Sequence, residues 1–423
     1  MTATATAVDP APAALPDPET DAPRTSDLIV VGAGTMGAWT AYWAQVGGGR
    51  RVTLLDAWGA GNPRATSGDE TRITRAAHGH DRLYTRWSRR ALQHWQHFQE
   101  EWGVQLFEPS GVLWFGGRQD GFEARSAEAL TAEGVPFEWL QPAEVAARWP
   151  QIAVGEGLQA ALFEPQAGAL YARRGIQATV AAFQREGGTF ALAGVRPGRG
   201  DGGRLREVVD ADGRTWSGDQ FVFCCGPWLP RLFPQLLRDV IRVTKQDVLF
   251  MGAAAGDDRF RAAALPAWAD FDAAYYGIGA TPDNGFKIAP DRLGPLFDPS
   301  RGDREVDLES VRLARIYLRR RFPDLADAPV VGTRVCQYES TPDGHFLIAP
   351  HPGYDNVWLA GGGSGHGFKH GPRIGEYLVR RMDGLPEGAQ EDDDERRFRI
   401  GPRLPGSTAR TDGDEMASGW ELF

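Results

Sequence analysis

The chain has few cysteines and no long apolar run, and these absences exclude several classes of protein. Its 423 residues include three cysteines, of which Cys224 and Cys225 are adjacent. Three thiols in this arrangement provide no disulfide framework, so we expect a cytoplasmic protein in a reducing compartment. No apolar run approaches about 20 residues, so no membrane-spanning helix is expected.

A secretion signal and an excess of positive charge are also missing. Residues 1–26 are rich in Ala, Pro, Thr and Asp and lack a basic start and an apolar core, which predicts a disordered tail. The net charge of −10 argues against nucleic acid or an anionic membrane as the main partner. Residues 391–423 are polar and begin with an acidic run, so we expect a surface extension without chemistry.

The remaining composition is that of an ordinary globular protein. Apolar residues make up 42% of the chain and charged residues 24%. A chain of 423 residues exceeds the size at which a single core usually splits. About two domains are therefore expected.

A glycine-rich turn near the N-terminus predicts a dinucleotide site. Residues 27–31 are expected to form a strand that leads into Gly32, Gly34 and Gly37, and residues 38–46 are compatible with a helix. Glycines at this point let backbone N–H groups approach a pyrophosphate at a helix N-terminus. This motif does not by itself choose between NAD and FAD.

The segment after this helix strengthens the prediction. Residues 51–55 are expected to form a second strand, and Asp56 at its end can accept hydrogen bonds from an adenosine ribose. Residues 61–75 are interpreted as a polar loop that carries Arg72 and Arg75. The small and polar residues around the arginines favour a loop packed against a ligand. Solvated surface charges are the alternative.

Three further segments are predicted to be helices. Apolar residues recur every three or four positions from 83 to 102, as in an amphipathic helix whose aromatic side chains belong to the core. Residues 174–186 form a second helical stretch, which ends at two glycines, and residues 307–321 form a third, which ends before Pro323.

At this point the chain resembles the monomeric sarcosine oxidase and N-methyltryptophan oxidase group of the D-amino-acid-oxidase-like flavoproteins. The resemblance runs from about residue 27 to about residue 381. A Ser-Gly-His-Gly-Phe-Lys motif after a glycine run, and a Cys followed two residues later by Tyr, are specific to this group. The matching segments are residues 32–37, 68–75, 110–115, 163–168, 226–228, 275–277, 286–287, 335–338 and 364–369.

The resemblance implies an α/β fold in which two domains are interwoven. A Rossmann-like FAD-binding domain of the glutathione-reductase-like type would be discontinuous and comprise residues 27–108, 165–241 and 344–390. A mixed-sheet α+β substrate domain would comprise residues 109–164 and 242–343.

The resemblance also implies FAD as the cofactor. Cys336 matches the cysteine that forms a thioether to the flavin 8α-methyl group, whereas a lone cysteine is otherwise usually a small buried apolar residue. His366 would contact the flavin rather than transfer protons. The full set of expected FAD contacts is Gly32, Gly34, Thr35, Met36, Gly37, Asp56, Ser67, Arg72, Arg75, Gly226, Trp228, Cys336, Gly363, Gly365, His366, Gly367 and Lys369.

The expected substrate residues follow from the same resemblance. Arg75 and Lys369 match the pair that holds the substrate carboxylate, through a bidentate guanidinium and an ammonium point charge. Lys287 matches the lysine placed near flavin N5 through a water, where a cation stabilises superoxide and favours an oxidase. Tyr276 and Tyr338 match aromatic residues of the substrate cavity. For Tyr338, core packing is an equal alternative, and a surface position is the alternative for Lys287.

The chain departs from the sarcosine oxidase pattern at three positions, one of which is Gln337 beside Cys336. Asp291 stands four residues after Lys287, where sarcosine oxidases carry a histidine that contacts the substrate. His78 stands where tyrosine is frequent. An acid in the pocket suits a larger or more polar amine, or a cyclic imino acid, so sarcosine specificity is not expected. The alternative is that Pro290 diverts the chain and Asp291 faces solvent.

The expected function is a cytoplasmic FAD-dependent amine oxidase, monomeric or dimeric. It would oxidise a secondary, N-alkyl or cyclic amino acid to an imine and reduce O₂ to H₂O₂. The alternatives are a dehydrogenase on the same fold, an NAD-dependent reductase, and a non-catalytic binding protein, against which Lys287 and Cys336 count. No metal is expected, because the eight histidines are scattered and His94 and His97 lack suitably spaced partners.

Overall fold

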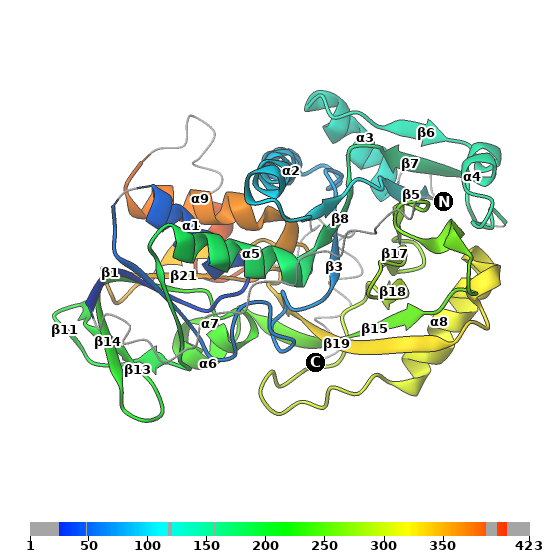
Figure 1. Cartoon of the computed structure of the whole chain (residues 1–423). Helices are drawn as coiled ribbons and strands as arrows, with labels where there is room; N and C mark the ends of the chain where they lie inside the picture. Colours follow the sequence, from blue (N-terminus) through cyan, green and yellow to red (C-terminus); the bar gives the residue numbers. More distant parts are fainter. Residues whose placement is uncertain (1–24, 48, 117–120, 156, 386–395, 404–423) are drawn as a thin grey trace, which may run out of the picture.

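The protein is built on two large β-sheets joined by a small one (Figure 1). The computed structural model describes residues 25–47, 49–116, 121–155, 157–385 and 396–403. Most of the predicted disordered tail lies outside these residues. Thr25 and Ser26 correct that prediction, because both belong to the first strand and Ser26 Oγ lies 2.7 Å from Thr53 Oγ1.

The first sheet has a parallel core of five strands. In it, β1 (Thr25–Val31) lies between β14 (Thr215–Phe223) and β2 (Val52–Asp56). On the outer sides, β2 pairs with β9 (Thr189–Leu192) and β14 with β21 (Val357–Gly361). The fold-class prediction of a Rossmann-like α/β domain is confirmed by this sheet.

Both faces of the first sheet are covered because its strands are apolar on both sides. Leu28 and Val30 join one apolar cluster with the helices above the sheet, whereas Ile29 and Val31 join another beneath it. Figure 1 shows α1, α5 and α9 on one side and α6 and α7 on the other. These helices are α1 (Thr35–Val46), α5 (Ala172–Arg185), α6 (Leu229–Leu232), α7 (Pro234–Leu237) and α9 (Gly371–Met382).

Shorter strands extend the first sheet by antiparallel pairing or stand beside it. They are β10 (Arg196–Pro197), β13 (Glu207–Val209) and β20 (Leu347–Pro350), with the hairpin of β11 (Gly200–Asp201) and β12 (Arg204–Leu205).

The second sheet is mixed and has eight strands in the order β19-β15-β18-β17-β16-β5-β7-β6. In chain order these are β5 (Val112–Gly116), β6 (Glu138–Leu140), β7 (Ala160–Glu164), β15 (Arg242–Met251), β16 (Ala267–Asp270), β17 (Tyr275–Ile278), β18 (Phe286–Pro290) and β19 (Val330–Ser340). Associated helices are α3 (Phe122–Ala132), α4 (Pro142–Arg148), α8 (Leu308–Arg321), η2 (Asp258–Phe260) and η3 (Pro323–Leu325).

A three-stranded sheet corrects the prediction that residues 61–75 form only a loop. Within that segment β3 (Thr71–Thr74) pairs with β8 (Gly168–Tyr171), which also pairs with β4 (Phe107–Glu108). The polar sequence of β3 concealed a strand whose partner lies about a hundred residues away.

The amphipathic pattern from 83 to 102 is confirmed as α2 (Arg82–Trp102), whose aromatic side chains pack in the core. The Asp81 carboxylate caps this helix by accepting a hydrogen bond from Leu83 N at 3.2 Å. None of the described helices has both the length and the apolar character needed to cross a bilayer.

The described part of the C-terminal extension corrects the expectation that 391–423 lies over the surface. Phe398 is fully buried, with its ring centroid 5.3 Å from that of Trp87. Arg397 pairs with Asp81 at 2.7 Å, which ties the same segment to the start of α2. The acidic run 391–395 and residues 404–423 lie outside the described residues.

Candidate active site

A cavity of about 360 Å³ opens beside the glycine-rich turn after β1. Most of the predicted FAD contacts line it. They are Gly32, Gly34, Thr35, Met36, Asp56, Ser67, Arg72, Gly226, Trp228, Gly363, Gly365 and Gly367. Residues from three distant parts of the chain therefore meet around one space.

The turn itself requires its glycines. Gly32 has φ of 101°, and a Cβ there would lie 2.4 Å from the Cys224 carbonyl oxygen. A Cβ on Gly37 would lie 1.8 Å from the Gly32 carbonyl oxygen. Gly37 therefore packs behind the turn. It was predicted as an FAD contact, but it is not among the residues that line the cavity. The close packing keeps the start of α1 against the cavity.

Asp56 supports this turn with its side chain. Its Oδ2 accepts a hydrogen bond from Ala33 N at 2.8 Å, and its Oδ1 accepts from Trp58 N and Gly59 N, each at 2.8 Å. Burial raises the pKa of Asp56, and these N–H donors oppose that rise. Contact with a ribose remains a prediction for this carboxylate.

The large cavity fits FAD on its own features. Gly34 provides no side-chain cap for α1, although Thr35 N donates a hydrogen bond to Ser67 Oγ at 2.9 Å. The Trp58 and Trp228 ring centroids lie 4.7 Å apart at the lining. Backbone donors at a helix start suit phosphates, and aromatic rings suit a flat heterocycle. Sequence reasoning missed Trp58, Asn62 and Arg231, which lie outside the matching motifs.

A second cavity, of about 70 Å³, adjoins the first and is lined by charged and aromatic side chains. Its lining holds all the predicted substrate residues except Lys287. It comprises Arg72, Ile73, Arg75, Trp114, Ala269, Phe271, Tyr276, Asp291, Cys336, Tyr338, Gly365, His366, Phe368 and Lys369. Arg72 and Tyr338 line both cavities, so the two spaces meet beside Cys336.

Arg75 is held at the end of β3 by aromatic and backbone groups. Its guanidinium donates a hydrogen bond to the Ala77 carbonyl oxygen and lies 5.1 Å from the Trp114 ring centroid. Glu164 fixes this corner by accepting hydrogen bonds from Trp114 Nε1 and Ala76 N, each at 2.8 Å. Burial lowers the pKa of Arg75 to about 10, with Glu164 opposing.

Lys369 lies in η4 (Phe368–His370), which precedes α9, and is buried. Its Nζ donates a hydrogen bond to the His366 carbonyl oxygen at 3.1 Å. Burial and the nearby charge of Arg75 hold the pKa of Lys369 well below its usual value. Arg75 and Lys369 therefore place two groups with lowered pKa values at one cavity. A bound anion would stabilise the protonated, positively charged form of each group.

Lys287 lies behind this wall and lines neither cavity. Its Nζ pairs with the Asp69 carboxylate and donates to the Thr71 carbonyl oxygen at 2.9 Å. Burial alone would raise the pKa of Asp69, but Lys287 and Arg72 outweigh it and hold that pKa below its usual value. Burial lowers the pKa of Lys287 itself. Sequence reasoning missed Asp69, although it lies in a motif that carried the resemblance.

Arg72 connects this ion pair to the candidate flavin cysteine. It pairs with Asp69 and its Nη2 lies 3.4 Å from Cys336 Sγ. Asp69 and Arg72 therefore link Lys287 to Cys336 by direct contacts. Of these two linking residues, the sequence predicted only Arg72.

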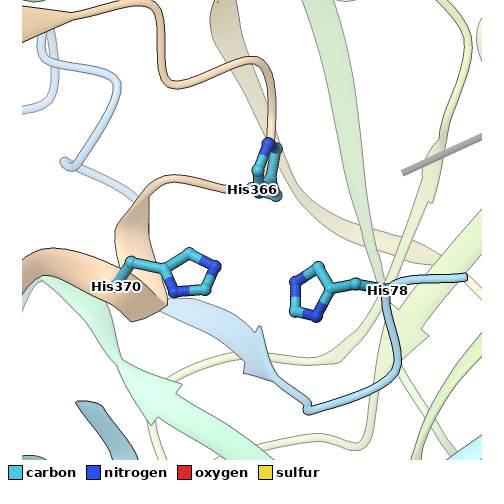
Figure 2. A group of neighbouring side chains, drawn as sticks. All are labelled: His78, His366 and His370. Carbon is cyan, nitrogen blue, oxygen red and sulfur yellow. The ribbon is translucent and has the colours of Figure 1, made fainter. Parts of the chain in front are cut away.

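Three histidines that the sequence separates lie together beside the small cavity, so the view of scattered histidines is wrong (Figure 2). Possible ligand nitrogens of His78, His366 and His370 lie within 4.8 Å of one another. Burial first, and then Arg75 or Lys369, hold the pKa of each well below its usual value. Arg75 and Lys369 also disfavour a metal ion here, because their positive charges repel a cation.

The chain belongs to the FAD dependent oxidoreductase family, which it matches over residues 27–381. It is 30% identical to monomeric sarcosine oxidase of Streptomyces avermitilis over 84% of this chain and 93% of that protein. It is 28% identical to peroxisomal sarcosine oxidase of Mus musculus over 85% of this chain and 93% of that protein. The predicted resemblance is thereby confirmed, and the protein is an FAD-dependent oxidoreductase with sarcosine-oxidase-like relatives.

Solved structures of similar fold extend this picture. L-proline dehydrogenase from P. horikoshii superposes with a TM-score of 0.76 at 20% identity, covering 87% of this chain and 96% of that one. NikD, an amino acid oxidase of nikkomycin biosynthesis, superposes with a TM-score of 0.74 at 21% identity, covering 90% and 98%. These likenesses define the fold.

Proposed function

We propose that this protein oxidises the C–N bond of a secondary, N-alkyl or cyclic amino acid to an imine. Two electrons and two protons leave the substrate, and O₂ accepts both electrons and both protons to give H₂O₂. The observation that carries this proposal is the small cavity, where Arg75 and Lys369 share a lining with Asp291 beside Cys336. The relatives named for sarcosine oxidation support the same bond class.

The two cations of the cavity would bind the substrate carboxylate. The Arg75 guanidinium offers a bidentate fork, and Lys369 adds a point charge when it is protonated. A carboxylate between them offsets the burial that lowers both pKa values, so binding charges Lys369. This polarity turns the amine end of the substrate away from the cations.

The cofactor would lie in the large cavity, held by the turn at Gly32 and Gly34 and by the glycines at 363, 365 and 367. When bound, FAD supplies the two-electron acceptor. We propose that Cys336 holds it through a thioether, since this thiol lies where the two cavities meet and Arg72 contacts its sulfur.

The lining of the small cavity suits a neutral reacting amine. His366 has a pKa well below its usual value because of burial and Lys369, so it is a neutral imidazole that accepts no proton readily. An uncharged amine needs no strong general base before its C–H bond breaks. The cationic side of the cavity disfavours a protonated amine at the same place.

Asp291 narrows the proposed substrate class. It is half-buried at the end of β18 and contributes to the cavity lining, as do Tyr276, Trp114 and Phe271. A carboxylate there can accept a hydrogen bond from a donor of the substrate that is distinct from the reacting nitrogen. Sarcosine lacks such a group, so a cyclic or larger N-alkyl amino acid that carries a further N–H or O–H donor fits the proposal better.

A dehydrogenase that passes electrons to another acceptor is the second candidate. It is favoured by one observation: Lys287 is paired with Asp69 and lines neither cavity, so its charge is partly neutralised. The oxidase proposal requires that the Lys287 ammonium still act on O₂ through the wall of the site.

The test begins with the visible spectrum of purified protein under anaerobic conditions. Proline, pipecolate, sarcosine and N-methyl aromatic amino acids are added one at a time, and bleaching reports reduction of the flavin. Air is then admitted and H₂O₂ is measured during steady turnover. Bleaching with steady H₂O₂ supports the oxidase, and bleaching with turnover only on an added dye supports the dehydrogenase. If none of the secondary amino acids bleaches the flavin, both the oxidase and the dehydrogenase proposals are overturned.

A further inference from the structure

Glu339 is a buried carboxyl in the wall of the large cavity that the mechanism above does not use. It lies on β19 and is 6% exposed. Its carbonyl oxygen accepts a hydrogen bond from Ser364 N at 3.0 Å, and β15 pairs with it through Val243. Strand and turn therefore fix the backbone from which this side chain reaches the cavity.

The carboxyl lies between two glycine turns that also line the cavity. Glu339 Oε1 accepts a hydrogen bond from Gly363 N at 3.3 Å. A Cβ on Gly226 would lie 3.0 Å from Oε2, and a Cβ on Gly363 would lie 3.3 Å from Oε1. Oε2 is buried and has no hydrogen-bond partner within the described part of the chain. Gly226, Gly363 and Glu339 all contribute to one lining.

Nothing described around this carboxyl favours its ionised form strongly. Burial raises the pKa of Glu339 to about 7, and only the Gly363 N–H opposes it. The titratable groups that interact with it from the end of β14 are Cys224 and Cys225. The pKa values of these thiols are raised by burial, and the charge of Glu339 contributes. An isolated buried carboxyl of this kind is neutral more readily than one paired with a cation.

We propose that Glu339 binds FAD as a neutral carboxylic acid whose hydroxyl donates a hydrogen bond to an acceptor atom of the cofactor. A buried donor without a partner is costly, and a ligand in this cavity supplies one. An ionised carboxylate would instead face a cofactor that carries a negatively charged pyrophosphate. The inference rests on FAD binding by the family and not on the proposed substrate.

The proposal makes cofactor affinity depend on pH in one direction. Only the neutral acid donates, so binding FAD raises the pKa of Glu339 and takes up a proton once pH exceeds the value in the free protein. Affinity is constant below that value and falls about tenfold for each pH unit above it. Replacement by glutamine keeps an N–H donor of similar shape and removes the titration.

The experiment uses the full-length Cys336→Ala protein, in which no thioether can form and FAD exchange is expected to be reversible. The dissociation constant of FAD is measured by flavin fluorescence between about pH 6 and about pH 9. Glu339→Gln in this background is expected to bind with similar affinity at the acid end and to lose the dependence on pH.

Glu123→Gln is the matched control, because burial also raises the pKa of Glu123 to about 7, yet this residue lines neither cavity. It is expected to leave the dependence intact. An unchanged slope in Glu339→Gln, or a slope abolished by Glu123→Gln, overturns the proposal.

A second measurement needs no cofactor exchange. The infrared spectrum of the intact holoenzyme at neutral pH is compared with that of the Glu339→Gln holoenzyme. We expect the carbonyl band of protonated carboxyls in the former and a weaker band in the latter, because Glu123 contributes to both spectra. Identical spectra in this region overturn the assignment, whatever substrate the enzyme uses.

Discussion

The two adjoining cavities are built in different ways. The large one is lined mainly by glycines and apolar side chains, and four of its 32 lining residues are charged, against four of 14 in the small one. The small one carries Arg72, Arg75, Lys369 and Asp291 among aromatic rings. Backbone donors recognise phosphate and ribose groups that every dinucleotide shares, whereas side chains recognise what distinguishes one substrate from another.

This difference separates the part of the site that is common to the family from the part that is particular to this chain. The glycine turns cannot change without a steric clash at Gly32 or Gly37. Asp291 and His78, by contrast, line or border the small cavity and depart from the sarcosine oxidase pattern. Substrate preference should therefore respond to the small cavity alone.

The largest expected effect is at Cys336, where the two cavities meet. If Cys336 carries the flavin, acid-precipitated wild-type protein stays yellow and each chain is heavier by the mass of one FAD. Cys336→Ala should release all colour into the supernatant. The matched control is Cys225→Ala, since Cys225 lines the large cavity only, and its pellet should stay yellow. A colourless wild-type pellet contradicts the prediction.

The next effect separates oxygen chemistry from substrate chemistry. Lys287→Met should slow re-oxidation of the reduced flavin by O₂ by about 10²-fold or more, because one preorganised cation is lost. Anaerobic reduction by substrate should change much less. Stopped-flow absorbance measures both half-reactions, with Lys245→Met, a lysine of neither cavity, as control. Equal losses in both half-reactions would assign Lys287 a structural role beside Asp69.

A smaller loss is expected from the carboxylate site. Arg75→Lys keeps a positive charge but removes the planar guanidinium that can bind a carboxylate at two points. It should weaken substrate binding by about 1.5–3 kcal/mol, or about 10- to 150-fold. The dependence of the anaerobic rate of flavin reduction on substrate concentration gives the dissociation constant. The corresponding amine without a carboxylate should bind wild type and variant alike. If Arg75→Lys weakened both ligands equally, the guanidinium would only support the cavity wall.

The smallest expected effect concerns preference within the substrate class. Asp291→Asn should lower kcat/KM for the favoured substrate by about tenfold, the scale of one hydrogen bond. Asp291→His should shift preference toward small N-methyl amino acids. Both variants are compared with wild type on sarcosine, N-methyl aromatic amino acids, proline and pipecolate. An unchanged ranking would place Asp291 outside substrate recognition.

Much of the dinucleotide half could be predicted because its signals are local. The strand before Gly32, the helix after it and the acid at Asp56 lie within about 30 residues, and they occupy one cavity wall. The amphipathic spacing from 83 to 102 was sufficient for α2 in the same way. An amphipathic spacing is set by a single helix that buries one of its faces. It can therefore be recognised without knowing which distant segment packs against that face.

Other features depended on which segments meet. The polar segment at β3 became a strand because β8 pairs with it, and Phe398 became core because Trp87 and Tyr377 surround it. The pairing of Asp69 with Lys287 joins residues 218 positions apart. A buried charge selects its partner by proximity in three dimensions, which spacing along the chain does not report.

By itself, the sequence determined the α/β class, the cofactor turn and the resemblance that the family match bears out. Only the tertiary structure decided that three histidines meet beside Lys369, that Gly37 packs behind the turn, and that Glu339 reaches the cofactor cavity. A glycine turn is encoded locally, by residues adjacent in the sequence. Burial, and the pKa shift that it causes, arises only when the folded chain removes water from a group.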